Sequence, residues 1–207
     1  MGNYKILFVT KTILNIYWYF QIVLIAAILF VGVSLWFNFD FINLNYLNGF
    51  NIHFSKIIFP DQLVFNGANY DFTLTNGGGR LHINDLDQKF VYLRILAALI
   101  DSIIYLMIIY FLRKIFKNLT ENRYFIRVNG MYIKKIAISI LVLAIVPQII
   151  QYITDIWIVN SIEIKNIIFK DEFNFKFETI LLGLLVFVIS IIFLRGIELK
   201  EDQDLTI

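Results

Sequence analysis

The sequence contains no cysteine, only two prolines and two histidines, and only 16% of its 207 residues are charged. Without cysteine the chain has no disulfide, no thiolate nucleophile and no cysteine-based metal site. Soluble domains carry about 25% charged residues, so this composition argues against a soluble globular fold. The net charge of +2 is too small to indicate nucleic acid as a direct partner.

Hydrophobic residues make up 59% of the chain and gather in long runs. A helix of about 20 apolar residues crosses the roughly 30 Å hydrocarbon core of a bilayer. The chain as a whole, residues 1–207, is therefore predicted to be a single membrane domain. Its fold class is an all-α membrane protein, a four-helix transmembrane bundle. We predict four spans, at about residues 13–37, 90–112, 136–159 and 177–194.

Basic residues are distributed unequally between the connecting segments. Segment 113–135, between the second and third spans, holds seven basic residues against a single acid, Glu121. The positive-inside rule places such a loop in the cytoplasm. With four spans, both termini are then cytoplasmic, including the tail, residues 195–207.

The two remaining segments, 38–89 and 160–176, alternate apolar and polar residues, as in FNFDFINLNYL, FNIHFSKIIF and FNFKF. This period of two is typical of strands with one buried face. The Asn76–Gly79 stretch is predicted to form a hairpin turn, because asparagine and glycine tolerate positive φ. We expect strands from both segments to pair into a small extracytoplasmic antiparallel β-sheet that caps the bundle.

Asp101 is an ionisable residue near the middle of the second span. An acid at that depth costs about 2.5–3.5 kcal/mol on insertion scales, so it needs a partner or a neutral form. Gln21 of the first span and Gln148 of the third fall at a similar depth, after Pro147 in the latter case. The three form either a polar cluster that responds to protons or a ligand, or a neutral carboxyl bonded to amides that holds helices together. Arg94, seven residues before Asp101, is expected to anchor at the outer interface.

No constellation of residues indicates catalysis or a bound cofactor. The histidines, His53 and His82, both lie in the strand-rich segment, and His82 and Asp85 would face opposite sides of a strand. The triglycine at residues 77–79 lacks the GK[ST] of a phosphate-binding loop. We therefore expect neither enzymatic activity nor a metal.

The C-terminal stretch RGIELKEDQDLTI carries four acids and ends in apolar residues. Such a peptide is either a solvated end or a short linear ligand for a cytoplasmic protein. The residues that would form this ligand are Leu199, Lys200, Glu201, Asp204, Leu205, Thr206 and Ile207.

The same tail resembles the ending G-x-x-L-K-E-x-x-D-L-T-I of an uncharacterised bacterial membrane family, domain of unknown function 2975. The inner loop is also similar, since residues 119–122 read Leu-Thr-Glu-Asn where the family has F-x-x-E-N; Leu119 replaces the phenylalanine. The resemblance implies a four-span protein of the bacterial cytoplasmic (inner) membrane. It also implies a cytoplasmic helix-turn-helix regulator as partner, but no activity.

Three hypotheses about function remain open at this point. The first is a membrane regulatory or signalling partner of a cytoplasmic protein, with an outer sheet as input and the tail as output. The second is a small transporter or channel component that uses the Asp101 cluster. The third is an immunity protein that blocks an external toxin.

Overall fold

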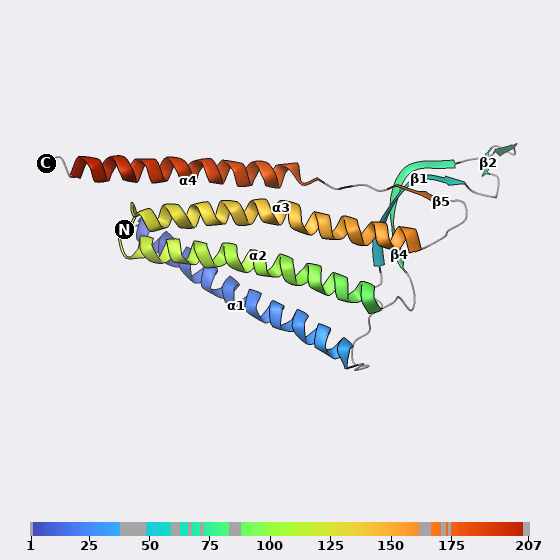
Figure 1. The fold of residues 1–207 in the computed structure, drawn as a ribbon, viewed down its shortest axis with the longest axis horizontal. Coiled ribbons are helices and arrows are strands. Elements are labelled where there is room, and N and C mark those ends of the chain that lie inside the picture. The colour runs from blue at the N-terminus through green and yellow to red at the C-terminus, as the bar shows by residue number, and fades with distance from the viewer. Residues whose placement is uncertain are drawn as a thin grey trace.

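The structure is a computed structural model that describes residues 2–37, 49–58, 63–65, 68–70, 73–82, 88–161, 167–170, 173 and 175–204. Long helices dominate it (Figure 1): α1 (Gly2–Trp36), α2 (Gln88–Thr120), α3 (Arg127–Ser161) and α4 (Phe177–Asp204). All four are long and apolar enough to cross a membrane, which confirms the predicted transmembrane helices. At 1.5 Å per residue they measure roughly 40–50 Å, so their ends extend beyond a core of about 30 Å.

The four helices lie side by side in the order of the sequence. The main contacts join α1 to α2, α2 to α3 and α3 to α4, and Figure 1 shows the helices as successive members of one row. The predicted bundle thus takes the form of an open row. Lipid tails are as apolar as leucine side chains, so a row in a bilayer gains little hydrophobic energy from closing on itself.

Two glycines set the spacing between α3 and α4. At Gly183 of α4, an added Cβ atom would lie 2.7 Å from Cδ2 of Leu141 of α3. At Gly130 of α3, it would lie 2.5 Å from Cδ2 of Leu194 of α4. Glycine therefore lets α3 and α4 approach closely at two levels, as small residues do in membrane helix pairs.

The turn between α2 and α3 is held by one buried side chain, Asn129, which is 1% exposed. Its Nδ2 donates to the carbonyl oxygens of Arg123 and Tyr124, both at 3.0 Å, and its Oδ1 accepts from Asn118 Nδ2 at 2.7 Å. Asn122 adopts a positive φ of 60°, a conformation that asparagine tolerates better than most residues. Asn122, the second residue of the Glu-Asn pair in the inner-loop motif, is thus the residue at which the chain reverses.

The strands form a small antiparallel sheet in the order β4-β1-β5. Its members are β1 (Gly49–Ile58), β4 (Thr73–His82) and β5 (Ile167–Phe169), and β2 (Leu63–Phe65) pairs separately with β3 (Ala68–Tyr70). Because β5 comes from the second strand-rich segment, the predicted pairing between the two segments is confirmed. The strand predicted at residues 38–48 lies outside the described residues.

The predicted hairpin turn at Asn76–Gly79 is wrong, because these residues lie inside β4, where Gly77, Gly78 and Gly79 pair with β1. Gly77 is the register partner of Phe54, whose ring occupies the place where a Cβ atom of residue 77 would stand. Glycine is needed here for close approach under an aromatic ring and not for chain reversal. Within the strand, Asn76 does have a positive φ, 52°, as the turn prediction assumed.

Candidate functional site

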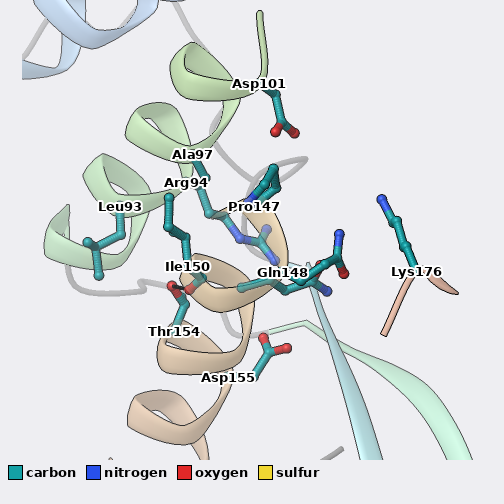
Figure 2. A pocket seen from close by; sticks show the side chains of 11 residues that line it. Leu93, Arg94, Ala97, Asp101, Pro147, Gln148, Ile150, Thr154, Asp155 and Lys176 are labelled. Atoms are coloured by element: carbon teal, nitrogen blue, oxygen red, sulfur yellow. Dashed lines mark hydrogen bonds between the residues drawn. The ribbon is translucent and has the colours of Figure 1, made fainter. Parts of the chain in front are cut away.

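A pocket of about 420 Å³ opens between α2, α3 and the residue that precedes α4 (Figure 2). Its lining is unusually polar for a site among membrane-spanning helices, with two acids, two bases, two amides and a hydroxyl. We call it the polar pocket. It is lined by Leu93, Arg94, Ala97, Asp101, Pro147, Gln148, Ile150, Gln151, Thr154, Asp155 and Lys176.

The α2 wall follows from helical spacing. Arg94, Ala97 and Asp101 stand at positions i, i+3 and i+7, so they share one face of the helix. Asp101 lies 13 residues from the first residue of α2, Gln88, which corresponds to about 20 Å of rise. The small side chain of Ala97 leaves room between the two charged groups.

The α3 wall has the same periodicity. Gln148, Gln151 and Asp155 stand at i, i+3 and i+7, with Thr154 beside them. Pro147 has no backbone N–H, so the helical hydrogen bond to the carbonyl group four residues earlier is not made. Pro147 itself lines the pocket. Gln148 is 6% exposed. A polar stripe therefore runs along α3 from mid-helix towards the end nearest the sheet.

Asp101 stands farther from the end of its helix than Arg94 or Asp155 does, and its carboxyl group points into the polar pocket (Figure 2). Its Oδ1 atom is buried and accepts no hydrogen bond in the part of the chain that the structure describes. Lys176 is near enough for its charge to act on this carboxyl group. A buried oxygen that accepts nothing favours the ligand-responsive interpretation of Asp101 over the role of a hydrogen-bonded link between helices.

Asp155 lies about one turn and a half from the end of α3, nearer the sheet. Arg94, through its positive charge, and His53 of β1 both lie near enough to act on it electrostatically. Strand β1 also contacts α3 directly. The sheet thus lies near the end of α3 that carries Asp155, and one of its strands is electrostatically coupled to the lining.

Only part of the predicted cluster comes together. Asp101 and Gln148 line the polar pocket, whereas Gln21 of α1 donates from Nε2 to the backbone oxygen of Ser102 at 3.2 Å. Gln21 shares with Asp101 a second, shallower pocket of about 370 Å³ on the α1 side of α2. Asp101 therefore separates two pockets, and the role of the cluster stays a prediction. Arg94 also lines the polar pocket, and its expected anchoring at the interface stays a prediction.

Asp155 and Lys176 were missed as site residues by sequence reasoning. Asp155 gave a signal, because it is an acid within an apolar run and stands seven residues after Gln148, on the same helical face. Lys176 gave none, since its position in a strand-rich segment does not indicate which helix it approaches. Identifying Lys176 as a site residue requires knowledge of how α4 packs on α3.

The predicted tail ligand falls at the far end of α4. Leu199, Lys200 and Glu201 are exposed on its last turns, and Asp204 is its final residue. Residues 205–207, Leu-Thr-Ile, lie outside the described residues. The helix that begins beside the polar pocket therefore continues without a break into the acidic tail.

Among the residues that the structure describes, no group of three or more histidine, aspartate or glutamate side chains is arranged to hold a metal ion. The hydroxyl of Thr154 donates to the carbonyl oxygen of Ile150 at 2.7 Å and so is occupied within its own helix. The arrangement can bind a small polar molecule through charges of both signs.

The comparisons with known proteins give one match. A family model with the description "Protein of unknown function (DUF2975)" matches residues 82–207, well over half of the chain. The matched range contains α2, α3, β5 and α4, and with them every residue that lines the polar pocket. No curated protein and no solved structure matches the chain.

Proposed function

This chain belongs to the DUF2975 family, and from that premise we propose that it is a non-enzymatic regulatory protein of the bacterial cytoplasmic membrane. In this proposal a small polar ligand with charges of both signs enters the polar pocket. The tail of α4 then presents the bound or empty state to a cytoplasmic protein. The family carries no assigned activity, so the proposal rests on the geometry.

One observation carries the proposal: a residue of the polar pocket starts the helix that ends in the tail. Lys176 lines the pocket, and its backbone oxygen accepts the N–H groups of Thr179 at 3.1 Å and Ile180 at 3.2 Å. These are the first hydrogen bonds of α4. A ligand that moves Lys176 therefore moves the start of a rigid helix. The helix can carry this movement to the tail, whereas a flexible connection would not.

A binding role is favoured over catalysis by the state of the lining groups. The one hydroxyl, that of Thr154, donates to its own helix and not to a base. General acid–base or nucleophilic chemistry needs a nucleophile within hydrogen-bond reach of a base. A salt-like lining of Arg94, Asp101, Asp155 and Lys176 instead suits recognition of a ligand that carries both charges.

The proposal assigns the sheet to the outside and the tail to the cytoplasm, because the basic segment 113–135 lies at the opposite end of the helices from the sheet. The absence of native cysteine makes this directly testable with single-cysteine variants. In intact spheroplasts, a membrane-impermeant maleimide should label Thr75→Cys on β4 and not Glu201→Cys on α4. Labelling of Glu201→Cys before lysis would reverse the orientation and remove the proposed role of the tail.

The regulatory role is tested by crosslinked pull-down from native membranes. The full chain is compared with a chain truncated after Lys200 and with the pocket variant Asp101→Asn. Ser34→Ala is the matched control, because Ser34 is also a buried polar residue of a spanning helix but lies outside the polar pocket. We expect a cytoplasmic protein, in the first instance a helix-turn-helix regulator, to be recovered only with the intact tail, in an amount that Asp101→Asn alters. Equal recovery with all four chains would refute the proposal.

A small transporter is the second candidate, favoured by the position of Asp101 between two pockets on opposite sides of α2. This model has the carboxyl group pass a proton or a ligand from one side of the helix to the other. Reconstituted vesicles that contain a pH-sensitive dye would report a proton flux. Flux that Asp101→Asn abolishes would favour transport, and no flux above protein-free vesicles would rule out proton movement.

A further inference from the structure

A second pocket, of about 280 Å³, lies at the end of the helices opposite the sheet, between α1 and the last turns of α2. We call it the basic pocket. It is lined by Lys11, Asn15, Tyr110, Arg113, Lys114 and Lys117. Four of these six side chains carry a positive charge, which separates this pocket from the mixed charges of the polar pocket.

Contacts within the protein hold the cations of the basic pocket in place. Arg113 donates from Nε to Oδ1 of Asn15 at 2.7 Å, and its guanidinium carbon lies 4.8 Å from the ring centre of Trp18. Lys11 donates from Nζ to Oγ1 of Thr120 at 3.5 Å, which joins α1 to the end of α2. The Arg113 guanidinium still has N–H groups beyond those it uses here, because it carries five. The site is therefore preorganised across two helices.

The positive charges of the basic pocket have no acidic partner among the residues that the structure describes. In the part of the chain that the structure describes, no carboxylate lies within ion-pair distance of Lys11, Arg113, Lys114 or Lys117. Four like charges around one small volume repel each other, and the repulsion is strongest where the surroundings exclude water. An anion that enters the pocket removes this repulsion.

The depth of the basic pocket identifies the kind of anion. The apolar run of α2 ends at Leu112, so Arg113, Lys114 and Lys117 follow directly where the hydrocarbon core ends. The ring centres of Trp18 and Tyr110 lie there 5.8 Å apart in a tilted arrangement, and such aromatic side chains are enriched at membrane interfaces. This is the level of lipid headgroups.

We propose that the basic pocket binds the phosphate group of an anionic lipid headgroup, with Arg113 and Lys11 fixed on opposite walls and Lys114 and Lys117 closing on the phosphate. Guanidinium and ammonium groups around a small volume match the oxygens of a phosphate. Basic pockets between spanning helices at the cytoplasmic side are a recurrent form of anionic lipid site. Inorganic phosphate offers the same chemistry, so the test separates the two sources.

The experiment uses the full chain reconstituted in vesicles, with Trp18 as the reporter because it contacts Arg113. Trp36→Phe and Trp157→Phe leave Trp18 as the single tryptophan. Quenching of its fluorescence by brominated phosphatidylglycerol is compared with quenching by brominated phosphatidylcholine. The pocket variant is Lys114→Gln with Lys117→Gln.

The matched control, Arg127→Gln with Lys134→Gln, removes the same charge at the same end of the molecule, but outside the basic pocket. We expect preferential quenching by phosphatidylglycerol in the parent. The pocket variant should lose on the order of 30-fold in relative affinity, since each well-placed lysine contributes about fivefold. The control should keep the preference. Relief of quenching by added inorganic phosphate would assign the same site to free phosphate as well.

Two results would overturn the proposal. One is equal quenching by the two lipids in the parent with no effect of inorganic phosphate. The other is an equal loss of preference in the pocket variant and in the Arg127/Lys134 control, which would assign the effect to general surface charge. Circular dichroism of each variant separates loss of the site from loss of the fold.

Discussion

Replacing Asn129 by alanine removes the side chain that closes the turn between α2 and α3, the two helices that form most of the polar pocket. Three hydrogen bonds disappear, to Arg123 and Tyr124 oxygens and from Asn118. Each is worth about 1 kcal/mol net. Because Arg123 and Tyr124 are exposed, water replaces part of the loss at their carbonyl groups, so we expect the free energy of unfolding to fall by about 2 kcal/mol.

The measurement is unfolding in mixed micelles of increasing SDS content, followed by far-UV circular dichroism. Tyr124→Phe is the control, since it removes one exposed hydrogen bond from the Tyr124 hydroxyl to Asn122 at 3.2 Å. That control should change the free energy of unfolding by less than about 0.5 kcal/mol. An Asn129→Ala protein no less stable than Tyr124→Phe would show that packing of α2 on α3, and not the hydrogen bonds of the turn, fixes the hairpin.

Three further substitutions test other parts of the structure in the same assay. Gly183→Leu inserts a side chain against Leu141 and should cost about 1–3 kcal/mol by forcing α4 away from α3; an unchanged stability would contradict the close approach. Asp101→Asn should leave stability equal or higher, because it removes a charge whose buried oxygen accepts no hydrogen bond among the described residues, and a fall of more than about 1 kcal/mol would instead make the carboxyl group a link between helices. Gly77→Ala places a methyl group against the Phe54 ring and should make the sheet more sensitive to limited proteolysis, whereas unchanged cleavage would mean that the ring moves aside at no cost.

The helices were predictable from sequence because hydropathy is a local signal. An apolar run of 20 residues specifies a spanning helix whatever its neighbours are, and the spans follow directly. The triglycine of β4 was misassigned for the opposite reason. Whether Gly77 turns or pairs depends on Phe54, 23 residues earlier, whose ring needs a partner without a side chain. A local pattern does not contain that information.

The polar pocket was half predictable, because some of its residues give a local signal and others depend on how distant parts of the chain pack. Asp101 and Gln148 stand out as polar residues in apolar runs, and helical periodicity would have added Asp155. Lys176 becomes a pocket residue only because α4 packs on α3 through Gly183. Gln21 does not line the polar pocket, because depth along a helix does not specify direction around it. Gln21 matches Asp101 in depth but reaches the Ser102 backbone instead.

The open row of helices also affects how the protein tolerates change. In a closed bundle each helix supports two others, whereas in a row the first member supports only its single neighbour. Because the main helix contacts of α1 are those with α2, a change in α1 acts on the polar pocket through α2, whereas α2 and α3 are each held from two sides. The row thus has one edge at α1 and another at α4, and the basic pocket lies at the α1 edge, where a single helix contact holds both of its walls together.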